Sequence, residues 1–457
     1  MTSAVAPRSD RPRVAIVGGG LAGLSAAAAL AGQALEVELF EARRRLGGRA
    51  ASFDDLPSGQ AIDHGQHVAM GACTALADLL RRAGLAGGLR RYRRIHFIGP
   101  DGRGHTLAAL PWLPAPLHLL AGLLRLRLVS LADRWHIART VAHWARQSER
   151  LLHSEQTAAK WLARQGASPQ TIERFWAPLL TSALGEMLDR VAAHAGAFVC
   201  RHALLGSRWA HELYLPTCPL AELFDHRLGR WLEEKGVVLR RSRRVAVIEG
   251  AHGHASAMVL ADGSRLAFHF VVLAVPWWQA SRLLAGALRA RLPEVDAASQ
   301  LPAAPITAVH LWFDRPITPL AHAALVGRTT QWLFRPAPPS DAGQHYCQVV
   351  ISASHGLRGN PHSALVEHVC DELRQTFPQA QAARLLRSRV VTEPSAVFAL
   401  HPGAEQLRPQ QQTAVPNLVL AGDWTATGWP STMESAVRSG FAAAGVILSR
   451  LGLNPPR

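Results

Sequence analysis

This chain of 457 residues has few cysteines and no metal-ligand spacing. The five cysteines stand far apart and include no C-x-x-C pair, so neither a thiolate metal site nor a redox dithiol is expected. We interpret them as buried free thiols. The histidines within residues 131–205 show no spacing such as H-E-x-x-H, and we therefore propose no metal. The five cysteines are Cys73, Cys200, Cys218, Cys347 and Cys370.

An apolar run long enough to cross a bilayer as one helix is also missing. The most apolar stretch, residues 107–124, is interrupted by three prolines and closed by Arg125 and Arg127, so we do not expect it to span a membrane. Two interpretations remain open. Trp112, the clustered leucines and the arginines suit an interfacial membrane segment, and the same run suits a helical cap over a substrate cavity. One segment can serve both roles.

The charge balance is strongly basic, with 49 Lys and Arg against 33 Asp and Glu and a formal charge of +16. No basic repeat or zinc-ligand spacing supports nucleic acid as the partner, and an anionic membrane surface or a pyrophosphate ligand suits the charge better. Residues 1–13 are polar, and the first apolar run is too short for a signal peptide. We expect a cytoplasmic protein, with peripheral association on the inner face of the cytoplasmic membrane.

The clearest motif lies at the start of the chain, in residues 13–49. The short apolar run Val14–Val17 predicts a strand, and an Ala/Leu-rich helix is expected from residue 21 to residue 31. Gly18, Gly20 and Gly23 between them have G-x-G-x-x-G spacing. In a dinucleotide site the first permits a tight turn, the second lets a pyrophosphate approach, and the third lets helix pack on strand.

A second predicted strand, residues 37–40, ends at Glu41, 18 residues after Gly23. A carboxylate at this position can accept both ribose hydroxyls, which favours a free 2′-hydroxyl. Glycine turns also occur in plain loops, but the strand, helix and acid together indicate a dinucleotide site. The helix N-terminus supplies N–H groups and a partial positive charge for the phosphates. The next residues, 43–49, end in Leu46-Gly47-Gly48-Arg49, which resembles a motif of flavin amine oxidases and carotenoid-type desaturases and so implies FAD rather than NAD. No cysteine in the glycine turn or in the C-terminal loop could attach the flavin ring, so we expect FAD to be held non-covalently.

The C-terminal part repeats a strand-loop-helix pattern. A buried strand at residues 418–421 leads to Asp423, which can bind a ribityl hydroxyl. A helix is expected to start at Thr432 and Met433, with its N–H groups toward the pyrimidine edge of a flavin.

Between these motifs, residues 131–205 are expected to be helical, with Trp135, Trp144, Trp161 and Trp176 as core or cavity residues. Residues 236–239 and 245–248 are interpreted as paired strands. A hairpin turned by Asp262-Gly263 and a buried strand from Val271 should then return the chain to the nucleotide-binding sheet.

The motifs VGGGLAGL, FEARRRLGGR and AGDWTATGWPSTMESAVRSG resemble those of the flavin amine oxidase and phytoene desaturase superfamily. The segments DHGQHV at residues 63–68 and VHLWFDRP at 309–316 bring the resemblance closest to the squalene-associated FAD-dependent desaturases, the hydroxysqualene dehydroxylases. One departure is His64, where that family commonly has asparagine.

The resemblance implies an α/β fold, α+β overall, in which a Rossmann-like FAD-binding domain is interrupted by a mixed, partly helical substrate domain. We expect residues 1–105, 206–300 and 396–457 in the FAD-binding domain, residues 106–205 in a helical cap, and residues 301–395 in a strand-and-helix part of the substrate domain. The expected cofactor-binding residues are Gly18, Gly20, Leu21, Ala22, Gly23, Glu41, Ala42, Gly48, Arg49, Gly65, Gln66, His67, Val245, Gly422, Asp423, Thr432 and Met433.

The resemblance also implies a reaction, the reductive removal of the hydroxyl of hydroxysqualene to give squalene in squalene and hopanoid synthesis. It implies an isoprenoid lipid substrate, other enzymes of squalene synthesis as partners, and no nucleic acid. His67, in the segment expected to pass the flavin ring, is the candidate acid for the departing hydroxyl, and simple packing near the ring is the alternative.

Two other functions stay open. One is an amine oxidase or polyene desaturase, which would use the flavin in the oxidative direction, and the other is a non-catalytic binding or escort protein. The sequence contains one G-x-G-x-x-G element that opens a βαβ unit. Electrons therefore come either from NADPH at an improvised site near the flavin, which the resemblance favours, or from a protein donor.

Overall fold

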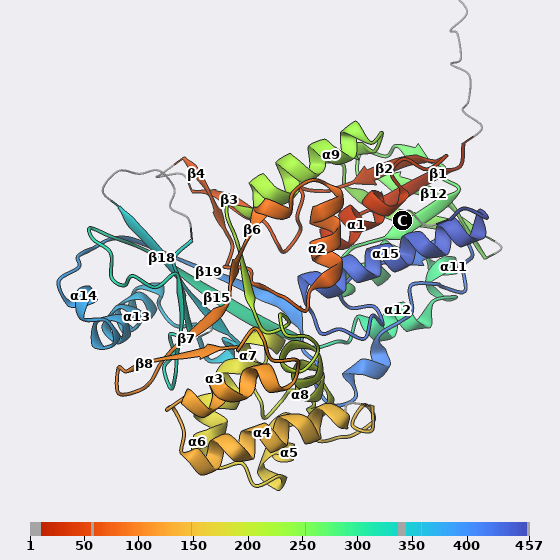
Figure 1. The fold of residues 1–457 in the computed structure, drawn as a ribbon. Coiled ribbons are helices and arrows are strands. Elements are labelled where there is room, and N and C mark those ends of the chain that lie inside the picture. The colour runs from red at the N-terminus through yellow and green to blue at the C-terminus, as the bar shows by residue number, and fades with distance from the viewer. Residues whose placement is uncertain are drawn as a thin grey trace, which may run out of the picture.

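The computed structural model describes residues 11–55, 59–147, 149–251, 253–336, 344–357 and 359–454. Most of the polar N-terminal stretch, on which the signal-peptide interpretation depends, lies outside these residues. The molecule has two large sheets with a group of helices below and between them (Figure 1). It is a mixed α/β protein, as predicted.

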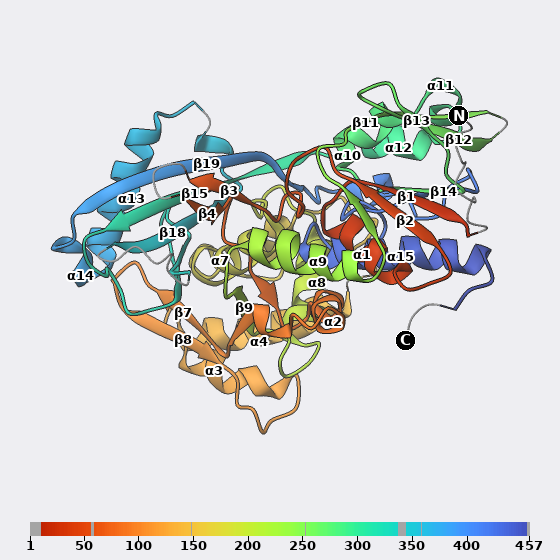
Figure 2. The same ribbon diagram turned by 90° about the horizontal axis from the view of Figure 1, so that it is seen from above.

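The first sheet is parallel and five-stranded. Its strand order is β10 (Val238–Arg240), β2 (Glu36–Phe40), β1 (Arg13–Val17), β14 (Phe270–Leu273) and β20 (Leu418–Leu420). Strands β1, β14 and β20 are almost wholly buried, because helices and a small sheet cover the two faces (Figure 2). This is the predicted Rossmann-like sheet, assembled from three separate parts of the chain.

Two helices pack closely on one face of this sheet. They are α1 (Leu21–Leu30) and α15 (Met433–Arg450), which lie side by side, and α9 (Leu228–Glu234) follows on the same face (Figures 1 and 2). The approach of α1 to α15 depends on Gly440, where a Cβ atom would lie 2.1 Å from the Ser25 hydroxyl oxygen and 2.2 Å from the Ala22 carbonyl oxygen. The first and last helices of the domain are therefore fixed to each other.

The predicted pairing of residues 236–239 with 245–248 is wrong. Strand β10 joins β2 in parallel, whereas β11 (Val245–Ala251) pairs with β12 (His254–Leu260) in a separate antiparallel sheet. The chain turns between them at Ser242, whose φ is 56°. Strand β2 accepts β10 at its free edge, so the four residues between β10 and β11 join two different sheets. The hairpin at Asp262-Gly263 is confirmed and leads into β13 (Arg265–Leu266).

The second large sheet has seven strands in the order β19, β15, β18, β17, β16, β7 and β8. Its longest members, β15 (Ala303–Phe313) and β19 (Leu385–Phe398), leave the first domain together and cross to the far side of the molecule (Figure 2). The Ala399 N–H donates to the Pro302 carbonyl at 2.7 Å, so the chain leaves and returns at one point. The shorter strands are β18 (His345–Ser352), β17 (Trp332–Phe334) and β16 (His322–Leu325), and α13 (His362–Thr376) and α14 (Pro378–Gln381) lie beside them.

The domain boundary predicted at residue 105 differs from the sheet topology. Strand β7 (Arg94–Ile98) pairs in parallel with β16, and β8 (Gly104–Ala108) pairs with β7. Residues 94–105 therefore belong to the seven-stranded sheet. Local alternation could not show this, because the partner strand lies more than 200 residues later. The smaller sheets are formed by β3 (Ser52–Asp55) with β4 (Gln60–Asp63), and by β5 (Ala69–Met70), β9 (Leu213–Pro216) and β6 (Leu89–Tyr92).

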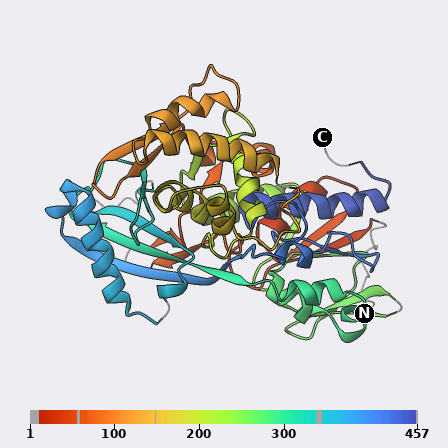
Figure 3. The same ribbon diagram turned by 90° about the horizontal axis from the view of Figure 1, so that it is seen from below.

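Residues 117–204 form the predicted helical cap, which lies along one side of the molecule (Figure 3). Trp144 and Trp161 stack at 4.4 Å between ring centroids, and Trp176 meets Trp144 edge-on, so these indoles are core residues as predicted. Trp135 is not, because its side chain is 55% exposed. The helices are α3 (Leu120–Arg125), α4 (Leu131–Arg146), α5 (Ala158–Arg164), α6 (Pro169–Thr171), α7 (Ala177–Leu184) and α8 (Ala193–Val199).

Among the described residues, no helix combines the length and apolar character needed to cross a membrane. The apolar side chains of residues 107–124 differ in their exposure to solvent: Leu107 and Leu123 are buried, whereas Trp112 and Leu117 are exposed. All five cysteines are free thiols, and Cys200, Cys347 and Cys370 are buried as expected. Cys73 and Cys218 are only partly buried.

Candidate functional site

The glycine turn between β1 and α1 has the geometry that its spacing predicts. Gly18 has a φ of 112°, and a Cβ atom there would lie 2.4 Å from the Ala274 carbonyl oxygen. At Gly23 a Cβ atom would lie 1.9 Å from the Gly18 carbonyl oxygen. Both contacts are with backbone atoms that cannot move aside, so only glycine fits. Leu21 and Ala22 form the first turn of α1, as predicted.

A second glycine turn lies directly against the first. The Gly47 N–H donates to the Gly19 carbonyl at 2.8 Å, and a Cβ atom at Gly48 would approach the Gly20 Cα to 3.0 Å. Gly20 begins α1 without a side-chain cap, and the first turn of α1 contains no acidic residue. The helix N-terminus thus presents backbone N–H groups beside two small residues, which fits the pyrophosphate of a dinucleotide.

Glu41 lies at the end of β2, next to the glycine turn. Its carboxylate accepts the Gly19 N–H at 2.7 Å and the Arg43 N–H at 2.8 Å. These bonds fix the carboxylate directly after β2, and its contact with a ribose stays a prediction. Ala42 follows it, and the Arg243 N–H, two residues before Val245, donates to the Glu41 carbonyl at 2.8 Å.

Arg49 joins the second glycine turn to the C-terminal loop. Its guanidinium pairs with the carboxylate of Asp423 and donates to the Ala396 carbonyl at 3.0 Å. Asp423 is buried and also accepts the Ser431 hydroxyl. Gly422, with a φ of 154°, precedes it, and its N–H donates to the Ser439 hydroxyl at 2.8 Å. The predicted site residues of the N-terminal and C-terminal parts therefore meet at one place.

The start of α15 is held in position by its own first turn. The Thr432 hydroxyl accepts the Ser435 N–H at 3.1 Å, which caps the helix before Met433. Glu434 is fully buried and accepts the N–H groups of Ala75 and Leu76, each at 2.9 Å. The carboxylate thereby caps α2 (Thr74–Arg82) and ties it to α15.

Residues 63–68 connect the two glycine turns to the seven-stranded sheet. A Cβ atom at Gly65 would lie 3.7 Å from the Ala308 Cβ on β15, and Gln66 donates its side-chain amide to the His67 carbonyl. The His67 Nδ1 lies 2.8 Å from the Gly65 carbonyl oxygen, which requires a proton on Nδ1. Burial lowers the pKa of His67, and the Arg49 charge lowers this pKa further. His67 is therefore neutral at pH 7, with an unprotonated Nε2.

Asp63 supports this segment. Its carboxylate accepts the Ser52 hydroxyl at 2.6 Å and the Leu220 N–H at 2.8 Å, which ties β4 to the start of the helix that ends in α9. Burial raises the pKa of Asp63 to about 6, although both hydrogen bonds lower it.

Two groups near the site were not predicted from the sequence. Glu186, in the loop after α7, is fully buried. Both of its carboxylate oxygens lie 3.1 Å from the His355 Nε2 atom, and its Oε2 atom also lies 3.1 Å from the His401 Nε2 atom. This cluster lies close to the Arg49 contact, because a Cβ atom at Gly185 would meet the Val397 side chain next to Ala396. The other group is Trp429, against which Phe198 of α8 packs edge-on at 5.0 Å. Trp429 lies within the C-terminal motif quoted above, but its contact with Phe198 and the Glu186 cluster join residues far apart in sequence, which no local pattern marks.

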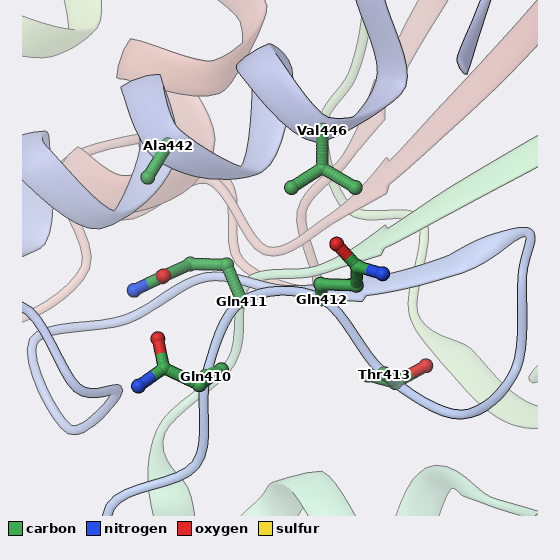
Figure 4. A pocket seen from close by; sticks show the side chains of 6 residues that line it. All are labelled: Gln410, Gln411, Gln412, Thr413, Ala442 and Val446. Carbon is green, nitrogen blue, oxygen red and sulfur yellow. The ribbon is translucent and has the colours of Figure 1, made fainter. Parts of the chain in front are cut away.

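A surface hollow on the outer side of α15 is separate from these residues (Figure 4). Ala442 and Val446 of α15 face a strip of glutamines across it, and none of the predicted cofactor residues lines it. We assign no function to it. In the part of the chain that the structure describes, no group of three or more His, Cys, Asp or Glu side chains is arranged to hold a metal.

The parallel sheet, the paired glycine turns and the buried Arg49–Asp423 contact define a dinucleotide-binding protein whose cofactor domain is assembled from separate chain segments. A model of the family described as flavin containing amine oxidoreductase matches residues 21–448. The chain belongs to this family, which implies FAD as the cofactor and oxidoreductase chemistry.

Individual relatives lie in several branches. The chain is 28% identical over 457 residues to a hydroxysqualene dehydroxylase of Sinorhizobium fredii, covering 95% of this chain and 98% of that protein. It is 24% identical over 466 residues to a 15-cis-phytoene desaturase of Solanum lycopersicum, covering 98% of this chain and 79% of that protein.

Solved structures share the fold. An oxidoreductase from Methanosarcina mazei superposes with a TM-score of 0.73 at 16% identity, covering 95% of this chain and 100% of that one. A putrescine oxidase with bound putrescine gives a TM-score of 0.70 at 16% identity, covering 96% of this chain and 99% of that one.

Proposed function

We propose that the protein removes the hydroxyl of hydroxysqualene reductively, giving squalene and water. The observation that carries the proposal is the similarity to hydroxysqualene dehydroxylases over nearly the whole length of both chains, and the contact between Arg49 and Asp423, two expected cofactor residues, supports it. The reaction breaks a carbon–oxygen bond and forms a carbon–hydrogen bond, so it consumes one hydride, which carries the two electrons, and one proton, which leaves with the hydroxyl as water.

The chain's own residues would hold the cofactor and shield the reacting carbon. The paired glycine turns at Gly20 and Gly48 would receive the pyrophosphate, Glu41 the ribose and Asp423 the ribityl chain. A bound reduced flavin supplies the hydride. The apolar cap would surround the isoprenoid chain and exclude water from the site. Non-covalent binding agrees with the absence of a cysteine from both motifs.

The departing hydroxyl needs a proton, and His67 remains our candidate for its delivery. Because His67 is neutral at pH 7, its Nε2 must first take up a proton before it can act as an acid. The rate should then rise as the pH falls toward the lowered pKa. A His67→Gln variant that keeps its FAD and its full rate at every pH would exclude this role.

The decisive experiment incubates FAD-loaded protein with hydroxysqualene and dithionite without oxygen, then analyses the lipid extract. Squalene should form, and boiled protein should form none. The physiological donor that we propose is NADPH, and anaerobic mixing with NADPH or NADH shows whether either bleaches the flavin absorbance. No bleaching by either would favour a protein donor.

A polyene desaturase is the second candidate, because phytoene desaturases also match over nearly the whole chain. Such an enzyme removes hydrogens and would convert phytoene while its flavin becomes reduced. Conversion of phytoene with a quinone as oxidant, and no squalene from hydroxysqualene, would select this alternative.

A further inference from the structure

We propose that the protein docks on an anionic phospholipid bilayer through one defined surface. The Trp112 surface consists of Trp112 and Leu117 from one loop, Trp209 from a second loop, and the arginines Arg91 and Arg208 beside them. It adjoins the cap helices α3 and α4, which lie at the opposite side of the molecule from α9 and the small β11–β13 sheet (Figures 1 and 2).

Exposed large apolar side chains concentrate in this part of the molecule. Among the described residues nine are exposed, and seven of them lie between residues 106 and 209. Trp112 is 72% exposed, more than any other of the nine, and Leu117 is 51% exposed. Tryptophan at the surface beside leucine is what an interfacial membrane contact uses. The seven are Trp112, Leu117, Leu131, Trp135, Leu152, Met187 and Trp209.

The two loops of the surface are joined to each other. Arg208 donates from Nη1 to the Pro111 carbonyl at 3.3 Å, next to Trp112, although the two residues are 97 positions apart. The guanidinium carbons of Arg208 and Arg91 each lie 4.7 Å from the Trp209 ring centroid. Arg91 also pairs with the carboxylate of Glu212. An indole and a cation at one site suit the region where lipid headgroups meet acyl chains.

The loop that carries Trp112 is closed by hydrogen bonds and rests on buried residues. The Leu110 N–H donates to the His118 carbonyl at 2.8 Å, and the His118 N–H donates to the Pro114 carbonyl at 3.1 Å, which closes the loop. His118 is fully buried, and Leu123 and Leu126 behind it belong to the core. Trp112 therefore stands on a fixed support, and inserting it into lipid requires no unfolding.

The charge around the surface selects an anionic partner. Residues 90–150 contain eleven arginines and three acidic residues. Arg125 and Arg127 at the end of α3 are exposed, while Leu126 between them is buried. Arginines close to an anionic bilayer are attracted to its negative surface potential, and this attraction weakens with added salt. A second copy of the chain would bring the same positive charge to the contact, so a bilayer is the better complement.

The advantage of docking rests on the proposed function, since an isoprenoid substrate dissolves in lipid. The docking itself does not, and it is measured without substrate. The full chain loaded with FAD is sedimented with vesicles of phosphatidylcholine alone, and with vesicles of phosphatidylcholine and phosphatidylglycerol in equal parts. We expect binding to the anionic vesicles that weakens as salt is added.

Two variants test the surface, each with a matched control. Trp112→Ser with Trp209→Ser should abolish most binding, whereas Val238→Ser with Leu386→Ser, which also removes two exposed apolar side chains, should not. Arg125→Gln with Arg127→Gln should lower the binding constant on the order of tenfold, and Arg230→Gln with Arg244→Gln should leave it nearly unchanged.

Equal binding to both vesicle types, or equal loss in the controls, would overturn the proposal. A dimer of wild-type protein in sedimentation velocity that the Trp112→Ser, Trp209→Ser variant lacks would assign the surface to a second copy instead. Binding without conversion of hydroxysqualene would reject only the proposed function, and conversion in detergent without binding would reject only the docking.

Discussion

The cofactor side and the cap of this molecule satisfy their buried polar groups in different ways. On the cofactor side, Glu434, Asp423 and Ser439 are buried and each has hydrogen-bond partners. In the cap and directly beside it, His194 and His211 are buried without a hydrogen-bond partner for either ring nitrogen, and the indole N–H groups of Trp144 and Trp176 also lack one.

The difference fits two different tasks. Directional bonds specify one arrangement, which a dinucleotide with several polar groups requires. Contacts between aromatic and aliphatic side chains tolerate small shifts, which suits a region that must surround an apolar molecule. We therefore expect substitutions on the cofactor side to act sharply and those in the cap to act gradually.

The largest effect is expected at the glycine turn. Gly23→Ala places a Cβ atom 1.9 Å from the Gly18 carbonyl oxygen, so α1 must move away from β1. We expect complete loss of FAD, measured by the absorbance of the purified protein, together with a large fall in melting temperature. Gly87→Ala is the control, because a Cβ atom there meets nothing within 4 Å. Normal FAD content in Gly23→Ala would show that the cofactor side is not as sensitive to substitution as the comparison with the cap predicts.

The next effect concerns the ion pair that links the two ends of the site. Arg49→Ala leaves the buried Asp423 carboxylate without its cation. Removing one partner of a buried pair costs about 3–5 kcal/mol. Part of Arg49 is exposed, so we expect the lower end of this range in urea unfolding without FAD. Arg45→Ala, whose partner Asp54 is largely exposed, should cost less than about 1 kcal/mol.

A smaller effect on stability is expected from two glycine substitutions in α15, which should act in opposite directions. Gly440→Ala inserts a methyl group against Ser25 and Ala22 of α1 and should destabilise the protein by about 1–3 kcal/mol. Gly445→Ala meets nothing within 4 Å and should stabilise it by about 0.5–1 kcal/mol. Urea unfolding of both variants measures the difference. Equal effects of the two changes would show that the helices do not pack this closely.

The smallest effect is a dependence of stability on pH beside the cap, where the His211 ring lies 5.4 Å from that of His118. Burial lowers the pKa of His211 to about 4, with His118 and Arg91 lowering it further and Glu212 opposing them. The unfolded chain takes up this proton first, so stability is lost as the pH falls from about 6.5 to about 4. Between pH 7 and pH 5 the loss is about 1–2 kcal/mol.

Hydrogen exchange of residues 117–145 at the two pH values measures this change, and residues 14–40 serve as the internal reference. His211→Leu should reduce the difference, whereas His254→Leu, at an exposed position, should not. An equal increase in hydrogen exchange of both regions at the lower pH would show that the effect of acid is not specific to the cap.

Much of the cofactor side could be predicted because its signals are local. The glycine turn, the end of β2 at Glu41 and the capped start of α15 are each encoded within a few residues. The remaining features could not be predicted, because they depend on contacts between segments that are far apart in the sequence. Glu186 contacts His355 and His401 across 169 and 215 positions, and β10 could have paired with β11 or with β2. Hydrophobic pattern shows that a strand forms but not which edge accepts it.

The hydrogen bond between Ala399 and Pro302 has a consequence for how such a protein can change. Everything from β15 to β19 is attached to the cofactor domain at neighbouring ends, as an inserted module would be. Exchanging residues 303–398 for the equivalent segment of a relative should therefore preserve the glycine turns, but it also replaces Ala396 beside Arg49, Ala308 beside Gly65, and the strand β16 that pairs with β7. Because Pro302 and Ala399 are in contact, a recombination event that replaces the whole segment between them joins the new segment at neighbouring points. The substrate domain can therefore change by recombination as well as by point mutation.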